Sequence, residues 1–381
     1  MTSRVVPSRV GWFELFYDLV IVASFAHTGH LIVGDLNGDL LTFSTGVWLV
    51  STFVVTFTLW FSTTAAVNIA PGDVPLRKLV IFAQMYCVTV ANLALSRSDG
   101  LPDDWGFAGL AAAFATVAVI YLITGRQRPE LRPVTAPWIA GSAAAAGLLA
   151  IGVVIPDDWQ TTQLAVYAAG IVVSIVPIVA VGIPRMCRMD LVVPEHLSER
   201  VGQLVIIVIG ESFLSLVLAL SGFESVPGPI FFGLTFLVAG SLWAIYFASV
   251  FPMGIPRAPA RLDLWILGVM IFLVGVSYLS EMLAAYSTVE WSRQGGPHGF
   301  IPLAAVYVLV GVLVLGWAGG QSRDRDFALV HLGALGILAV MWIVLVMAGS
   351  PANLLLVGSA ALVIGDGMAC VFLQRRRTLV A

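Results

Sequence analysis

Residues 12–33 read WFELFYDLVIVASFAHTGHLIV, an apolar stretch that carries two acids and two histidines among long aliphatic and aromatic side chains. A helix of about 20 mainly apolar residues is long enough to cross the hydrocarbon core of a bilayer. The stretch lacks the small-residue cleavage pattern of a signal peptide, so we expect it to remain in the chain as a membrane anchor.

The composition of the whole chain agrees with this stretch. Apolar residues make up 59% of the 381 residues and charged residues only 11%, whereas soluble domains carry about 25% charged residues. The formal net charge of −3 also lacks the basic surface that a nucleic-acid binder needs. These values exclude a soluble enzyme, a disordered scaffold and a nucleic-acid-binding protein.

Twelve segments of the sequence have the length and apolar content of a membrane span. We therefore predict an all-α polytopic membrane protein with about twelve transmembrane helices. The predicted spans lie near residues 12–33, 45–70, 76–96, 104–124, 134–155, 160–183, 199–222, 228–250, 262–288, 299–318, 327–348 and 352–373.

The basic residues orient these spans. With the N-terminus in the cytoplasm, every Lys and Arg except Arg97 and Arg293 falls at an inner segment. Cytoplasmic loops are enriched in Lys and Arg. The sequence therefore predicts a multi-pass protein of the bacterial inner membrane with both termini in the cytoplasm.

Two segments of the chain resemble each other at an offset of 185 residues. Glu14 and Glu199 each precede Leu-Val-Ile by five residues, and Asp18 and Gln203 stand directly before it. Trp60 and Trp243, each preceded by Leu, occupy similar places in the next spans. We predict a parallel six-plus-six repeat, with a first half at 1–184, a cytoplasmic interfacial linker at 185–198 that contains a short helix, and a second half at 199–381.

Ionisable side chains inside spans are costly and mark functional candidates. In the first span, Glu14 and Asp18 share one helix face because they are four residues apart, and His27 and His30 lie further along the same helix. Each pair also has a purely structural interpretation, as helix caps or as interfacial side chains.

Glu211 stands in the middle of the seventh span, where Gly210 would allow a neighbouring helix to approach closely. We expect its carboxyl to face the bundle interior, with Ser212 beside it. Glu281 and Asp366 are further candidates in the ninth and twelfth spans.

No motif in the sequence announces an enzyme, a metal site or a cofactor. The three cysteines, Cys87, Cys187 and Cys370, have no CxxC or Cys/His ligand spacing, and His331 is expected near the membrane interface. The sequence therefore predicts no cofactor and no bound metal.

The segments Trp12-Phe-Glu-Leu-Phe-Tyr-Asp-Leu-Val20 and Glu199-Arg-Val-Gly-Gln-Leu-Val-Ile-Ile-Val-Ile-Gly-Glu-Ser212 resemble the bacterial low temperature requirement A (LtrA) family. The resemblance implies a polytopic inner-membrane protein of a family named for a cold-growth phenotype, without a generally established activity. The positions that match the family pattern are Glu14, Asp18, Glu199, Arg200, Glu211 and Ser212.

This chain departs from the family pattern at two places. Ala248 follows Tyr246-Phe247 where the family pattern would have an acid, and Arg261-Leu-Asp263-Leu-Trp265 replaces an Arg-Asp pair with a nearby His. The chain is therefore expected to be a divergent member, and a proton or ion mechanism shared by the family is in doubt for it.

Three functions remain open on the sequence. A transporter or permease would carry a small molecule, with Glu211 and the face of Glu14 and Asp18 binding a proton or cation. An enzyme acting on a lipid or hydrophobic metabolite would use Glu211 with His27 or His30 as acid and base. A structural or regulatory membrane protein would need neither a proton- or cation-binding site nor an acid–base pair. The expected partners are the bilayer and an unknown small molecule, with no nucleic acid, and the oligomeric state is open.

Overall fold

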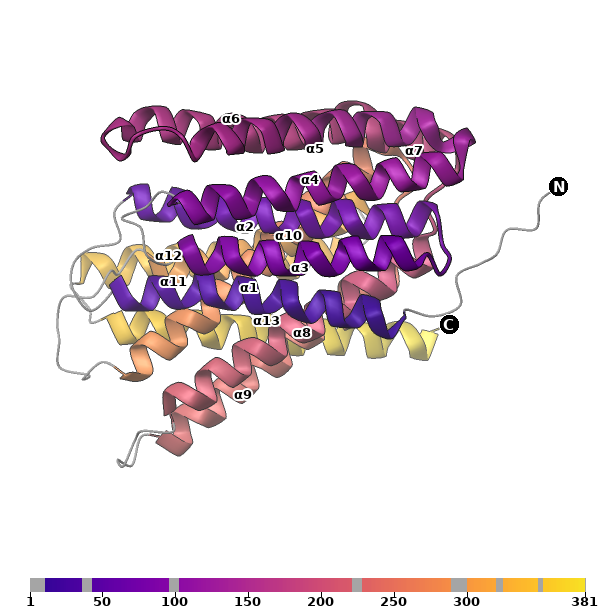
Figure 1. Ribbon diagram of the computed structural model, residues 1–381. Coiled ribbons are helices and arrows are strands. Elements are labelled where there is room, and N and C mark those ends of the chain that lie inside the picture. The colour runs from indigo at the N-terminus through magenta and orange to yellow at the C-terminus, as the bar shows by residue number, and fades with distance from the viewer. Residues whose placement is uncertain are drawn as a thin grey trace. The chain divides into compact units, whose positions relative to one another are not determined.

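Figure 1 shows the computed structural model, which describes residues 11–35, 43–95, 103–220, 228–288, 300–319, 325–348 and 352–380. Within these ranges the chain forms helices joined by short turns, with no strand. The prediction of an all-α protein is confirmed for this part of the chain.

A helix covers each of the twelve predicted spans. In chain order the structure contains α1 Trp12–Asp35, α2 Phe43–Ile69, α3 Pro75–Leu95, α4 Asp104–Gln127, α5 Arg132–Gly152, α6 Gln160–Pro177, α7 Ile183–Arg188, α8 Pro194–Leu220, α9 Gly228–Ala244, α10 Pro259–Thr288, α11 Phe300–Ala318, α12 Arg325–Met347 and α13 Ala352–Val380. Among the described residues, nine helices are long and apolar enough to cross a membrane. The positions of the helices are confirmed, and the number of spans stays a prediction.

The chain divides into two compact units. The first contains Met1–Thr28, Phe43–Gln203 and Arg257–Asp263, and the second contains Gly29–Thr42, Leu204–Pro256 and Leu264–Ala381. The change of unit therefore falls inside α8, just beyond the predicted linker at 185–198. The six-plus-six repeat itself stays a prediction.

In the first unit, α3, α4, α5 and α6 pack against one another in chain order, and α2 packs on α4 and α6 (Figure 1). Small residues bring the backbones together: a Cβ added to Gly109 on α4 would lie 2.9 Å from the backbone nitrogen of Ala91 on α3. Between α4 and α5, the rings of Tyr121 and Trp138 stack with centroids 4.7 Å apart. This packing supports the helices that carry the site described below.

The connection between α6 and α8 agrees only in part with the prediction. After Pro177, which lacks a backbone N–H, the helix widens into the π-helical segment Ile178–Gly182 and continues directly into α7. A turn with Asp190 at φ 51° follows, and α8 begins at Pro194. The short helix predicted within 185–198 coincides in part with α7, which ends at Arg188, while residues 194–198 belong to α8. Its interfacial position stays a prediction.

In the second unit, α13 packs against α9, α11 and α12. Helix α9 continues as the π-helical segment Ile245–Val250, which also contacts α13. Helices α9 and α13 approach closely at Gly367, where an added Cβ would lie 2.7 Å from Cβ of Ser241 and 2.9 Å from its Cα and carbonyl oxygen. The face of α13 next to Gly367 is thus held tightly against α9.

Candidate functional site

The first turn of α1 positions the first acid of the site. The backbone N–H of Gly11, just before the helix, donates to Oε2 of Glu14 over 2.9 Å. This contact satisfies one of the backbone donors that a helix start leaves without a partner. The contact also turns the Glu14 side chain back toward the first residue of α1, where it lies next to the N-terminal part of α8.

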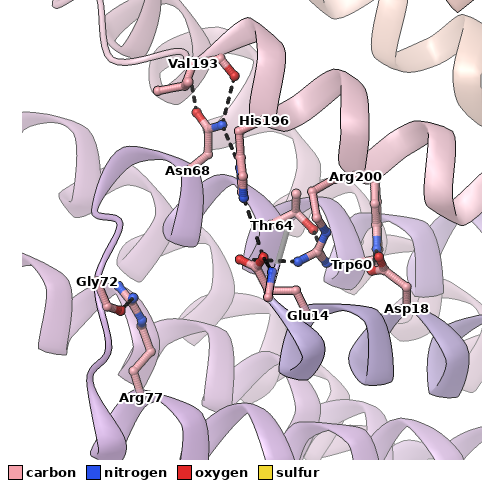
Figure 2. A network of polar contacts seen from close by, with 11 residues as sticks. Glu14, Asp18, Trp60, Thr64, Asn68, Gly72, Arg77, Val193, His196 and Arg200 are labelled. Atoms are coloured by element: carbon pink, nitrogen blue, oxygen red, sulfur yellow. Dashed lines mark hydrogen bonds and ion pairs between the residues drawn. The ribbon is translucent and has the colours of Figure 1, made fainter. Parts of the chain in front are cut away.

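Asp18, one turn further along α1, is fully buried and held by two charge-assisted contacts. Arg200 on α8 donates through Nη2 to Oδ1 of Asp18 over 2.5 Å, and Trp60 on α2 donates through Nε1 to the same oxygen over 2.7 Å (Figure 2). Arg200 also donates to Oγ1 of Thr64 over 3.3 Å. Three helices of the first unit, α1, α2 and α8, therefore meet at one ion pair.

Glu14 is held more loosely than Asp18. Its Oε1 lies 3.5 Å from Nη1 of Arg200, and its Oε2 lies 3.5 Å from Nε2 of His196. The Glu14 side chain is 16% exposed, whereas the Asp18 side chain is not exposed at all. The same guanidinium thus makes one tight and one weak contact with the two acids, which confirms that Glu14 and Asp18 share a helix face.

Asn68 on α2 fixes the orientation of the His196 ring. Its amide oxygen accepts from the backbone N–H of Val193 over 3.0 Å and its amide nitrogen donates to the Val193 carbonyl over 3.1 Å. The same nitrogen lies 3.3 Å from Nδ1 of His196. Because an amide nitrogen can only donate, Nδ1 accepts, and the ring carries its proton on Nε2, which faces Glu14 (Figure 2).

A cavity of about 660 Å³ opens beside these residues in the first unit. Glu14, His196 and Arg200 line one part of it, and Arg77 and Lys78 of α3 line another. The α3 cations already have partners: Lys78 pairs with Asp73 over 2.7 Å, and Arg77 donates to the carbonyls of Ala70 and Gly72, each over 2.7 Å. Among the mostly buried ionic groups of the lining, Glu14 is therefore the one with the longest ionic contacts.

The structure brings together Glu14 and Asp18 with Trp60, which the sequence indicated only as a repeat position. It adds His196 and Thr64, which sequence reasoning missed, and Asn68, which the sequence indicated only as a possible hydrogen-bond partner between helices. The signal for His196 was its place one turn before Arg200, but this segment was predicted to be a linker. The lining of the cavity includes neither Asp18 nor Glu211.

The predicted candidates on α8 are spread along the helix. Glu199 is exposed, and Gln203 is half-buried with its Oε1 lacking a hydrogen bond. In the second unit, Glu211 is partly exposed and Ser212 is buried. The close helix contact predicted at Gly210 is not seen: the residue is exposed, and an added Cβ would meet no atom of the described residues within 4 Å.

Other predicted positions have different outcomes. The side chains of His27, His30 and Glu281 lie outside the part that the structure describes, although α1 and α10 run through these residues. Trp243 is 51% exposed, whereas Trp60 is fully buried. Asp366 is buried in the second unit, close to His331.

His331 is fully buried within the second unit, and the depth near the membrane interface predicted for it stays a prediction. His331 lies on α12, which packs against α13, so the face that carries His331 is covered. Nothing in the sequence indicated which face of α12 meets α13.

A family model described as bacterial low temperature requirement A protein (LtrA) matches residues 9–288. All residues of the network around Arg200 fall within this match. No curated protein and no solved structure matches the chain. With several helices that are long and apolar enough to span a membrane, and with the family pattern over most of its length, the chain is a membrane protein that belongs to the bacterial low temperature requirement A (LtrA) family.

Proposed function

We propose that the protein transports a small molecule across the bacterial inner membrane and that Glu14 is its exchangeable carboxylate. One observation carries the proposal. A partly exposed acid, which accepts one backbone hydrogen bond from Gly11 and makes two ionic contacts of 3.5 Å, borders a cavity of about 660 Å³ directly next to a tight buried ion pair. Ligand pockets typically have volumes of about 300–1,000 Å³.

The two acids of α1 have different roles in this proposal. Asp18, with its contacts to Arg200 and Trp60, joins the three helices and stays paired. Glu14 can leave His196 and Arg200 and instead bind a positively charged group of a substrate, or a proton. When it does, Arg200 remains neutralised by Asp18, so the exchange leaves no buried cation unpaired.

His196 can report the state of Glu14 to the rest of the helix bundle. A second proton on Nδ1 would set that nitrogen against the Asn68 amide, since both would then be donors. A proton or substrate that displaces Nε2 of His196 from Glu14 therefore changes the contacts of a ring whose Nδ1 already accepts a hydrogen bond from Asn68. The network provides a link between cavity occupancy and the start of α8.

We further propose twelve spans, with both termini in the cytoplasm and with the bilayer as the surrounding partner. The distribution of Lys and Arg supports this topology, as does a helix at each predicted span. The two six-helix halves of a parallel repeat would then enter the membrane in the same direction.

The test is proton-linked uptake in proteoliposomes that enclose a pH-sensitive dye. Wild-type protein is presented with primary amines, amino acids and organic acids in turn. We expect at least one of these classes to change the internal pH, and we expect Glu14→Gln to abolish the change. Glu195→Gln serves as the matched control, because Glu195 is an exposed acid in the first turn of α8, next to His196.

Two results would overturn the proposal. One is flux through Glu14→Gln at the wild-type rate, and the other is the absence of flux with every compound class. Turnover of a compound in detergent, without any gradient, would instead identify a membrane-embedded enzyme. A Glu14→Gln protein that only loses stability would indicate a structural role.

A further inference from the structure

A second cluster of chemically active side chains lies in the second unit, and the proposed transport does not use it. It consists of His331 on α12 and of Asp366 and Cys370 on α13. Nδ1 of His331 lies 2.8 Å from Oδ2 of Asp366, and Nε2 of His331 lies 3.9 Å from Sγ of Cys370. The donor atoms that the three residues can offer lie within 4.8 Å of one another.

The polar atoms of this cluster are buried without adequate partners. Asp366, His331 and Cys370 are at most 4% exposed. Among the described residues, neither oxygen of Asp366 makes a hydrogen bond, and Nδ1 of His331 makes none either, although it lies 2.8 Å from Oδ2. A buried carboxylate without hydrogen bonds is costly, and a metal ion would satisfy it together with the imidazole.

We propose that His331, Asp366 and Cys370 bind one transition-metal ion of the zinc class. An imidazole nitrogen, a carboxylate oxygen and a thiolate sulfur together are a donor set typical of zinc, and oxygen-preferring ions such as magnesium and calcium do not use thiolate. Three protein ligands leave a fourth coordination position open, as in zinc sites that bind a further molecule.

The geometry fits a single ion. Bonds of about 2.0–2.3 Å in tetrahedral arrangement place the donor atoms roughly 3.3–3.7 Å apart. One ring nitrogen of His331 can bind a given ion, and with one donor atom from each residue the three atoms lie within 4.8 Å of one another. The donors must therefore close in by about 1 Å, which side-chain rotations can supply. Asp366 and Cys370 are four residues apart and therefore share the face of α13 that meets His331.

The charges also fit. A divalent cation, one carboxylate, one thiolate and a neutral imidazole sum to zero. This sum matters because an uncompensated charge inside an apolar helix bundle is unfavourable. Without the ion, the cluster is neutral only if the thiol keeps its proton and a further proton resides on Asp366 or on His331, which face each other over 2.8 Å.

Neighbouring groups hold the three ligands in place, as the outer contacts of metal sites do. The ring of Phe327 meets the His331 ring edge-on, with centroids 4.5 Å apart. Gly367, directly after Asp366, fixes α13 against Ser241 of α9. The cluster also lies beyond residues 9–288, so the family match does not imply it.

The test is metal binding by the purified full-length protein after removal of metals with a chelator. Added Co²⁺ should bind stoichiometrically and give a thiolate-to-metal charge-transfer band in the near ultraviolet. Zn²⁺ should abolish the band and raise the unfolding temperature. We expect Cys370→Ser to remove the band and His331→Gln and Asp366→Asn to weaken binding at least tenfold. Cys87→Ser and Cys187→Ser are the matched controls, and both variants should keep the charge-transfer band.

Metal-free unfolding temperatures show whether each variant folds. Asp366→Asn keeps the side-chain volume, so it provides a folded test protein if Cys370→Ser fails. A missing charge-transfer band in the wild type would overturn the proposal, as would a band that survives in Cys370→Ser. Rapid alkylation of Cys370 by a membrane-permeant maleimide, unchanged by Zn²⁺, would also overturn it and would indicate a reactive thiol next to a His–Asp pair instead.

Discussion

The two buried acids Asp18 and Asp366 lie in similar surroundings but differ in their partners. Both are on apolar helices, one in each unit, and both are almost completely buried. Oδ1 of Asp18 receives hydrogen bonds from Arg200 and Trp60, whereas neither oxygen of Asp366 has a hydrogen bond from the described residues, although Nδ1 of His331 lies 2.8 Å from its Oδ2. Burial alone therefore does not define a site: the first acid faces a guanidinium, and the second faces an imidazole that is a cation only when it is protonated.

The largest expected effect comes from removing the cation of the first acid. Arg200→Met leaves Asp18 and Glu14 without their common partner, and breaking a buried ion pair in this way costs about 3–5 kcal/mol. The free energy of unfolding in detergent, measured by denaturant titration, should fall by this amount.

The matched change in the second unit is Asp366→Asn, measured without metal. The ionisable partner of this acid is His331, whose Nδ1 lies 2.8 Å from Oδ2, and no guanidinium is removed. We therefore expect a smaller loss of stability in the metal-free protein than for Arg200→Met. Equal destabilisation by Arg200→Met and Asp366→Asn would contradict the contrast between the two acids.

The sequence predicted the helices well because span length and apolar content are local properties. It also predicted the common face of Glu14 and Asp18, because that face follows from helix periodicity. It could not show that His331 meets Asp366 and Cys370, since nothing in a single sequence states which face of α12 packs on α13. The expectation of no metal site rested on ligand spacing along the chain, which does not detect ligands contributed by two separate helices.

A smaller effect is expected at the second donor of Asp18. Trp60→Phe removes the indole N–H that donates to Oδ1, and a hydrogen bond to a charged group contributes about 1.5–3 kcal/mol. Trp243→Phe is the control from the equivalent predicted repeat position. Trp243 is half-exposed, so its loss should change stability by no more than about 0.5 kcal/mol. Similar losses at both positions, in the same denaturant titration, would remove this distinction between the two predicted repeat positions.

The smallest effect is expected from the backbone beside Asp366. An alanine methyl at Gly367 would lie 2.9 Å from Cα and the carbonyl oxygen of Ser241, and because these are backbone atoms, α13 must shift. Such overpacking costs about 1–3 kcal/mol.

Gly365→Ala is the control, since a Cβ there meets nothing within 4 Å. If the second acid is a metal ligand, Gly367→Ala should also weaken Co²⁺ binding, while Gly365→Ala and Trp60→Phe leave it unchanged. Unaltered Co²⁺ binding in a destabilised Gly367→Ala protein would show that the ligand geometry does not depend on the close contact between α9 and α13. In that case, Asp18 and Asp366 would differ only in the groups that contact their side chains. The packing of α13 against α9 would have no influence on cation binding by Asp366.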